Sequence, residues 1–170
     1  ISAGAMGFSP VQRLMDWASE ILHIDRNPSG VMELPEDSDA EYRSLEEAML
    51  ANGVEPVGCP TWVPEDYVFS YAQAMVSDDT IKFAASYVSL ERGELFIRVT
   101  MYNDITSTSF EKNEGGYTYT YAGIAFDIVQ NLDITKIGWQ LDSCAYSITG
   151  PLEKKEAEHM INSIEIKEGE

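Results

Sequence analysis

Residues 81–101 read IKFAASYVSLERGELFIRVTM. Every second side chain is apolar on both sides of the turn-like Glu91-Arg92-Gly93. The two apolar sets are Ile81, Phe83, Ala85 and Tyr87, and then Leu95, Ile97, Val99 and Met101. Alternation with period two is typical of strands that bury one face, and a glycine-containing turn between two such strands predicts a β-hairpin. This stretch therefore places the chain among proteins built on an antiparallel sheet.

The same alternation extends in both directions from this hairpin. On the N-terminal side, Tyr67, Phe69, Tyr71 and Met75 are expected to share one face of a strand. On the C-terminal side the turns fall at Ala122-Gly123, Asn131-Leu132-Asp133 and Leu141-Asp142-Ser143. Turn signals about every ten residues predict a meander of about six strands. Such short connections allow only antiparallel neighbours.

Three segments show the spacing of helices instead. The first follows Ser9-Pro10 and carries apolar residues through Leu22. The second opens on Ser38-Asp39-Ala40-Glu41, which has the form of a capping box, and stops at Asn52-Gly53. The third is expected to start at Gly150-Pro151 and to run to Ile164, with a short final strand over 164–167.

These elements together predict an α+β fold. We expect a curved antiparallel sheet with two N-terminal helices and one C-terminal helix packed on one face, because the two faces of the strands are unequal in polarity. The division that the pattern favours is a helical segment over 1–55 and a sheet domain over 56–170.

The charge of the chain restricts its partners. Lysine and arginine together number 11 and aspartate and glutamate number 29, so the formal net charge is −18. Such a charge repels nucleic acid phosphates and anionic lipid headgroups, and we expect neither as a partner. No stretch approaches the roughly 20 apolar residues of a spanning helix. A membrane would therefore be reached only through an anchor outside this chain.

The sequence contains no motif that predicts a reaction. The sequence contains no Gly-x-Ser-x-Gly elbow, no Ser-x-x-Lys, no phosphate-binding glycine loop and no dinucleotide fingerprint. His23 and His159 have no second ligand at metal-binding spacing. Cys59 and Cys144 could form a disulfide in an oxidising compartment, or be two separate small hydrophobes. We expect a non-enzymatic domain with no cofactor and no metal.

Aromatic residues supply the candidate binding site. Tyr117, Tyr119 and Tyr121 form a stripe on one strand. Phe96 and Tyr102 fall on the face opposite to Leu95 and Ile97. Rings with hydroxyl groups can bind peptides, sugars or apolar ligands, although tyrosines are also ordinary strand formers that pair across a sheet. Tyr117, Tyr119, Tyr121, Phe96 and Tyr102 are the predicted ligand-binding residues.

Two motifs at the ends of the strand region carry a family resemblance. Residues 62–67, Trp-Val-Pro-Glu-Asp-Tyr, resemble a Trp-x-Pro-x-Gly-Tyr opening, from which Asp66 departs where glycine is usual. Residues 137–140, Ile-Gly-Trp-Gln, followed by 144–152 and a helix to Ile164, resemble the matching close. Together they resemble a bacterial family catalogued as a domain of unknown function. Its members typically lie on the outer side of a single transmembrane helix in Gram-positive bacteria, some in anti-sigma-factor-like proteins.

The resemblance implies a location and a kind of role. We expect an extracellular or cell-surface domain tethered by an upstream transmembrane helix, and residues 1–8 are apolar enough to follow such an anchor. Its function would be sensing or protein interaction, with an unknown protein or small ligand at the cell surface as partner. Two alternatives stay open. One is a binder of a small apolar ligand or peptide on the concave sheet face, and the other is a cell-wall or glycan hydrolase.

Overall fold

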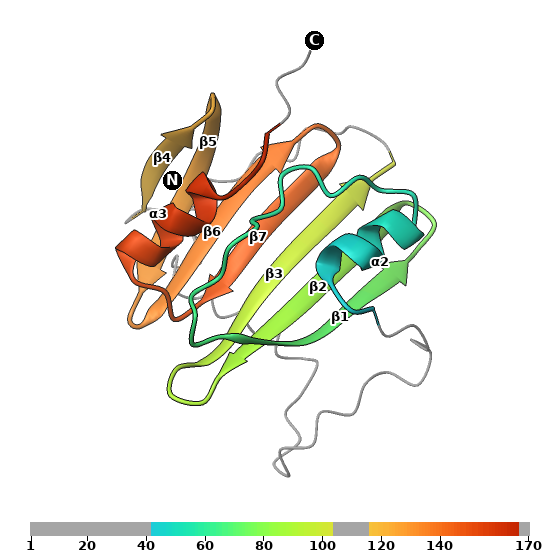
Figure 1. Cartoon of the computed structure of the whole chain (residues 1–170). Coiled ribbons are helices and arrows are strands. Elements are labelled where there is room, and N and C mark those ends of the chain that lie inside the picture. Colours follow the sequence, from blue (N-terminus) through green and yellow to red (C-terminus); the bar gives the residue numbers. More distant parts are fainter. Residues whose placement is uncertain (1–41, 104–115, 167–170) are drawn as a thin grey trace, which may run out of the picture. The chain divides into compact units, whose positions relative to one another are not determined.

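A computed structural model describes residues 42–103 and 116–166 (Figure 1). They form a seven-stranded antiparallel sheet and two helices, so the predicted α+β class is confirmed, with seven strands instead of about six. The strands are β1 Val68–Val76, β2 Thr80–Ser89, β3 Gly93–Tyr102, β4 Tyr117–Tyr121, β5 Ile124–Asn131, β6 Ile134–Leu141 and β7 Cys144–Gly150. The helices are α2 Leu45–Ala51 and α3 Lys154–Asn162. The helix predicted after Ser9-Pro10 lies outside the described residues.

The strand order shows that the sheet is not one continuous meander. The order is β1-β2-β3-β7-β6-β5-β4, and every neighbouring pair is antiparallel. One meander, β1 to β3, therefore meets the last strand of a second meander, β4 to β7. The prediction of a single meander is wrong at this junction. Short turns fix the neighbours within each half, but no short turn joins β3 to β4, so β7 can occupy the edge of β3.

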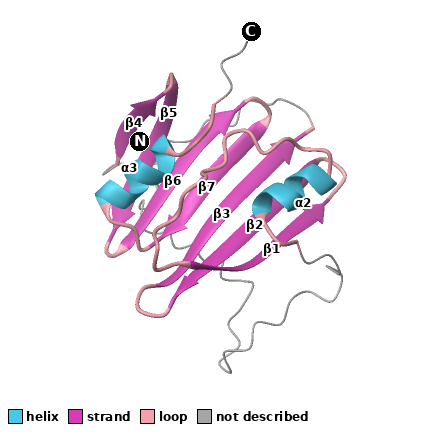
Figure 2. Ribbon diagram, viewed as in Figure 1, coloured by secondary structure: helices cyan, strands magenta, loops and turns pink. Residues whose placement is uncertain are grey.

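Side chains of alternate residues make one face of the sheet, the covered face, into the core. Its buried members include Phe83, Ala85, Leu95, Ile97, Val99, Phe126, Ile128, Ile137, Trp139, Tyr146 and Ile148. The indole of Trp139 stacks on the ring of Tyr146, with centroids 5.3 Å apart. Helix α2 lies over β1 and β2, α3 lies over the β4 to β6 end, and the linker 52–67 crosses the same face between them (Figure 2).

A β-bulge changes the face assignment predicted for the first strand. Phe69 pairs with Tyr87, but Tyr71 pairs with Ser86, so the register shifts between Phe69 and Tyr71. A bulge inserts one extra residue and inverts the side-chain alternation beyond it. Tyr67, Phe69, Tyr71 and Met75 therefore do not share a face as predicted, because Phe69 lies on the covered face and Tyr71 on the other.

Helix α2 begins later than its predicted capping box. Its N-cap is Ser44, whose hydroxyl accepts a hydrogen bond from the Glu47 amide at 3.0 Å. Tyr42, which the sequence placed inside the helix, instead makes an antiparallel bridge to Ala72 of β1. The predicted stop is confirmed, since Asn52 is the C-cap and Gly53 has φ +76°. The helix packs against β1 and β2.

Helix α3 also begins later than predicted. Its N-cap is Glu153, which forms a capping box with Glu156, so Pro151 precedes the helix and does not start it. Thr135 explains the delay, because its hydroxyl donates to the Leu152 carbonyl at 2.7 Å and holds residues 151–152 against the sheet. Residues 164–166 are not a strand, in contrast to the predicted final strand.

Candidate functional site

The other face of the sheet, the second face, carries no helix among the described residues (Figure 1). Its side chains alternate with those of the core. Its central members are Tyr71, Ala84, Ser86, Phe96, Arg98, Thr100, Lys136, Gly138, Ser147 and Thr149. This face brings cations, hydroxyl groups and aromatic rings together across five strands.

The pairing register arranges the second face in rows that run across the strands. One row consists of Tyr71, Ser86, Phe96, Thr149 and Lys136, taken from β1, β2, β3, β7 and β6. The next row, two residues along each strand, consists of Ala84, Arg98, Ser147, Gly138 and Asp127. Residues directly opposite each other in such rows have Cβ atoms about 5 Å apart. Arg98 and Lys136 therefore flank β7, with Ser147 and Thr149 between them.

The burial of these groups is unusual for a polar sheet face. Arg98, Lys136, Phe96 and Tyr71 are all half-buried, and Ser86 is fully buried. The hydroxyl of Ser86 has no hydrogen-bond partner within the described part of the chain. Burial, together with the nearby charge of Arg98, lowers the pKa of Lys136 to about 8. At neutral pH this lysine is still mostly charged.

The five predicted ligand-binding residues do not lie on one surface. Phe96 and Tyr102 lie on the second face, as their position opposite to Leu95 and Ile97 predicts. Tyr117, Tyr119 and Tyr121 lie on the covered face, beside α3.

Contacts with α3 hold two of these tyrosines. The Tyr119 hydroxyl donates to Asn162 Oδ1 at 2.9 Å. The Lys154 ammonium lies 5.0 Å from the centroid of the Tyr117 ring. These contacts give Tyr117 and Tyr119 a structural role at the junction of sheet and helix.

Sequence reasoning missed three residues of the second face, namely Tyr71, Arg98 and Lys136. Arg98 stands between Phe96 and Thr100 in the alternation of β3, which was a usable signal. Lys136 precedes the buried Ile137 and is therefore on the opposite face. No local pattern shows that only β7 lies between the strands of Arg98 and Lys136. The bulge in β1 moves Tyr71 to the second face, which the alternation of the sequence did not predict.

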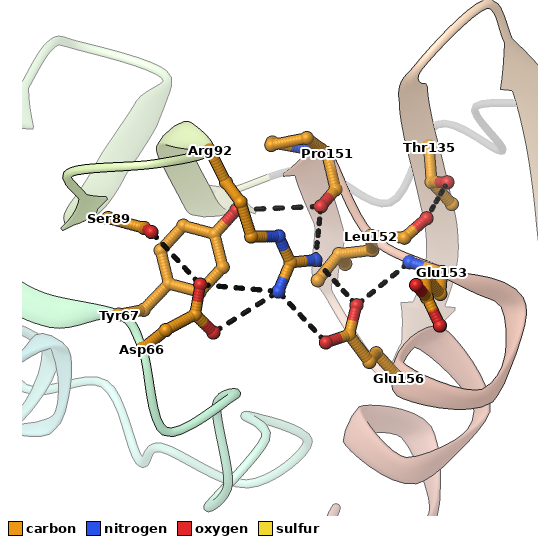
Figure 3. Close-up of polar contacts among 9 residues, drawn as sticks. All are labelled: Asp66, Tyr67, Ser89, Arg92, Thr135, Pro151, Leu152, Glu153 and Glu156. Atoms are coloured by element: carbon orange, nitrogen blue, oxygen red, sulfur yellow. Dashed lines mark hydrogen bonds and ion pairs between the residues drawn. The ribbon is translucent and has the colours of Figure 1, made fainter.

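A polar cluster around Arg92 connects the β2–β3 turn, the segment before β1 and helix α3 (Figure 3). Arg92, in the β2–β3 turn, contacts Asp66 Oδ1 at 3.1 Å and Glu156 Oε2 at 2.6 Å, and its guanidinium lies 5.1 Å from the Tyr67 ring centroid. Asp66 also accepts from the Ser89 hydroxyl at 2.9 Å. Burial would raise the pKa of Glu156, but the hydrogen bonds from Arg92 and from the Glu153 amide, together with the charge of Arg92, lower the pKa. Because Arg92 binds both carboxylates, this cluster is a structural clamp.

The clamp gives Asp66 of the motif at residues 62–67 a structural role. Asp66 is the carboxylate that binds Arg92 and Ser89. The same motif is fixed at its other end. Trp62 stacks on His159 of α3 with ring centroids 3.8 Å apart, and its backbone amide donates to the Ser163 hydroxyl at 3.2 Å. Residues 62–67 therefore contact the C-terminal end of α3 directly and are linked through Arg92 to Glu156 in its first turn.

The cysteines, the acidic residues and the helices provide no further candidate site in the described part of the chain. Cys59 and Cys144 are buried free thiols, and Cys59 Sγ lies 3.5 Å from Met49 Sδ. Across residues 42–103 and 116–166, no group of three His, Cys, Asp or Glu side chains could hold a metal ion. None of the helices described here is long and apolar enough to cross a membrane.

Comparison with known proteins gives one match. Residues 58–164 match the family described as Domain of unknown function (DUF4367). The matched region starts in the linker before Trp62 and includes all seven strands and α3. No curated protein and no solved structure matches the chain significantly. Since the match covers more than half of the sequence, the chain belongs to the DUF4367 family.

Proposed function

We propose that this chain is a non-enzymatic binding domain that acts outside the cytoplasm, where its second face contacts a protein or small ligand at the cell surface. The observation that carries the proposal is the asymmetry of the sheet. Both described helices and the linker 52–67 lie on the covered face, whereas the second face carries Phe96 and Tyr102 and has no described helix over it. Aromatic rings are among the residue types enriched at binding surfaces.

The extracytoplasmic location is supported by the two motifs that end the strand region. Residues 62–67 and 137–152 resemble domains on the outer side of a membrane anchor. A net charge of −18 suits a surface-exposed protein that stays apart from anionic lipid. In this reading the domain is carried by an anchor and senses or binds a partner through the sheet.

A binder of a small apolar ligand or peptide is the second candidate, and one feature favours it. Phe96 stands between Ser86 and Thr149 in a single row, with Tyr71 at the end of that row. A ring flanked by hydroxyl groups offers both apolar contact and hydrogen bonds, which is the usual composition of a small-molecule or peptide site.

The location is tested with the full-length protein in cells. A protease-cleavable site with an epitope tag, inserted directly after Glu170, should be cut in intact cells by added protease. Protection of the tag until the cells are lysed would contradict an extracytoplasmic domain.

The binding face is tested by photo-crosslinking. A benzophenone amino acid is introduced in place of Tyr102, and in a matched variant in place of Tyr117, a partly exposed tyrosine on the covered face. We expect a discrete crosslinked product with a different molecule from position 102 and no such product from position 117. Equal products from both positions, or products from 117 alone, would remove the second face from the proposal.

A further inference from the structure

We propose that the outer edge of β4 pairs with β4 of a second copy of this chain, so that two sheets join edge to edge across a two-fold axis. Strand β4, Tyr117–Tyr121, is the last strand in the sheet order. Within residues 42–103 and 116–166, only β5 pairs with it. The inference goes beyond the proposed function, because it concerns an edge of the sheet and not the second face.

The turn between β4 and β5 determines which backbone groups of β4 point outward. Ala122 and Gly123 form this two-residue turn, and both have a positive φ, 50° and 79°. A turn of this kind is closed by hydrogen bonds between the residues on either side of it, so the backbone groups of Tyr121 point toward β5. Orientation alternates along an antiparallel ladder. The amides and carbonyls of Thr118 and Thr120 therefore point away from β5, beyond the edge of the sheet.

Strand β4 lacks the features that protect natural edge strands. Such strands usually carry charged residues, proline or a bulge, or lie beneath another segment. Strand β4 reads Tyr-Thr-Tyr-Thr-Tyr, two residue types with high strand propensity, and its register with β5 is continuous. The opposite edge differs, because β1 has a bulge after Phe69 and is bridged by Tyr42 at Ala72. Of the two edges, β4 is the one suited to accept another strand.

The sequence of β4 is the same in both directions, which fits it to an antiparallel copy of itself. A two-fold axis at Tyr119 places Thr118 opposite Thr120 of the second copy, and Tyr117 opposite Tyr121 of the second copy. In this register the outward-pointing backbone groups of the threonines meet and exchange hydrogen bonds. Threonine pairs and aromatic pairs are also favourable cross-strand neighbours. Like residues thus face each other along the whole strand.

The charge and the length of β4 predict a weak dimer. Each copy has a net charge of −18, so two copies repel each other. The five residues of β4 are uncharged, so the repulsion comes from the rest of each chain and is screened by salt. Five residues a side are also fewer than the roughly 20–30 of a standard interface. Association should therefore be reversible and should become tighter with added salt, whereas a contact built on ion pairs would become weaker.

The experiment is sedimentation velocity on the complete chain at about 5 µM and about 500 µM, each in about 50 mM and about 500 mM NaCl. We expect monomer at the lower concentration, a substantial dimer fraction at the higher one, and at least threefold tighter association in the higher salt. A chain that stays monomeric throughout would overturn the proposal and leave the edge to a strand of a different protein. Association that weakens with salt would overturn it as well.

Charge substitutions on β4 test the register. Thr118→Lys combined with Thr120→Lys places like charges opposite each other and should weaken association at least tenfold. Thr118→Lys combined with Thr120→Glu places opposite charges at the same points and should restore association to within threefold of the unmodified chain. The matched control is Met75→Lys combined with Val76→Lys, two exposed residues of β1, and it should leave association unchanged. Equal weakening by both β4 variants, or loss of association in the control, would overturn the proposal.

Hydrogen–deuterium exchange of the unmodified chain tests the pairing even where a variant fails to fold. Fragmentation mass spectrometry resolves the exchange to single amides. The amides of Thr118 and Thr120 should exchange at least twofold more slowly at about 500 µM than at about 5 µM, because the second copy accepts their hydrogen bonds. The amide of Leu90, in the exposed β2–β3 turn, should not change. Exchange at Thr118 and Thr120 that does not depend on concentration would contradict the pairing.

The dimer and the proposed binding face can fail separately. A benzophenone in place of Tyr117 would join two copies of the chain, and this product differs in mass from a product with a different molecule. A dimer without a crosslink from position 102 would leave the pairing of β4 intact and remove the binding face. A monomer that still gives the crosslink from position 102 would do the reverse.

Discussion

Arg92 and Glu156 join the β2–β3 turn to helix α3. Two guanidinium nitrogens contact the two carboxylate oxygens at 2.9 Å and 2.6 Å, in the paired geometry that lysine cannot reproduce. Through Asp66 the same arginine also holds the residues before β1. One side chain therefore connects three segments that are remote in sequence.

Replacing Arg92 by alanine should lower the free energy of unfolding by about 1–2 kcal/mol, because the half-buried Glu156 and the exposed Asp66 lose their hydrogen-bonded cation. Arg92→Lys should restore only part of this loss. Urea denaturation measures both. The matched control is Lys154→Gln, which removes an exposed pair at 4.0 Å and should change stability by less than about 0.5 kcal/mol. An Arg92→Ala protein as stable as the control would refute the clamp.

Gly58 combines a positive φ, which favours glycine, with close packing. Its φ is +91°, and a Cβ there would lie 3.0 Å from Leu141 Cδ2 and 3.1 Å from Tyr146 Cζ. Gly53 has φ +76° but nothing within 4 Å of a Cβ, so it isolates the backbone effect. Gly53→Ala should lower the free energy of unfolding by about 1 kcal/mol, because alanine disfavours a positive φ. Gly58→Ala should lower it by at least about 2 kcal/mol more, because the added methyl group overpacks the core. Equal losses of unfolding free energy in the two variants, measured by thermal or urea unfolding, would mean that the linker shifts at Gly58 without cost.

Burial of the Cys59 thiol predicts a loss of stability at alkaline pH. Burial, with a smaller effect from Glu46, raises the pKa of Cys59 from 9.0 to about 12. Between these values the unfolded chain releases a proton that the folded chain retains, so stability is complete below pH 9 and falls as pH rises toward 12.

The test of this effect is the slope of stability against pH. Urea unfolding is measured from pH 7 to pH 10.5 for the unmodified chain and for Cys59→Ala, each relative to its own value at pH 7. The unmodified chain should lose stability more steeply above pH 9 than the variant. Parallel curves would show that Cys59 does not titrate across this window. Cys144→Ala is the comparison for the second buried cysteine, whose pKa burial also raises.

Two tyrosine hydroxyls on the covered side allow a matched comparison. The Tyr146 hydroxyl donates to the Val57 carbonyl in a part-buried site, and the Tyr119 hydroxyl donates to Asn162 Oδ1 in an exposed one. Tyr146→Phe should lower stability by about 1–2 kcal/mol, because the Val57 carbonyl is left without that donor. Tyr119→Phe should cost less than about 0.5 kcal/mol, since water replaces the lost partner. The reverse order in chemical denaturation would contradict these contacts.

Local pattern was enough to predict most strands, and it failed where the cause is not local. The alternation around Gly93 predicted β2, β3 and their pairing, because period two and a tight turn act within one hairpin. The local pattern could not show that β7 pairs with β3, because this pairing depends on which strand edge is available when the two meanders meet. The bulge after Phe69 also depends on tertiary packing, because either face of β1 could present apolar residues to the core.

The candidate site was predictable in part for the same reason. Phe96 and Tyr102 were assigned to the correct face from alternation alone, whereas Tyr117, Tyr119 and Tyr121 face α3. A stripe of tyrosines has the same sequence signature whether a helix or a ligand lies on it. Arg98 and Lys136 belong to one face only because β7 stands between β3 and β6.

The pairing of β3 with β7 has a consequence for how the chain reaches its final state. During synthesis β1 to β3 emerge first, and the far edge of β3 stays without its partner until the whole second meander has followed. In the finished sheet the edges are β1 and β4. In the nascent chain the vulnerable edge is instead β3, whose alternating apolar residues would template mispairing with another unfinished copy. Efficient production of this domain thus depends on how fast β7 arrives, and pauses in translation after β3 should favour aggregation.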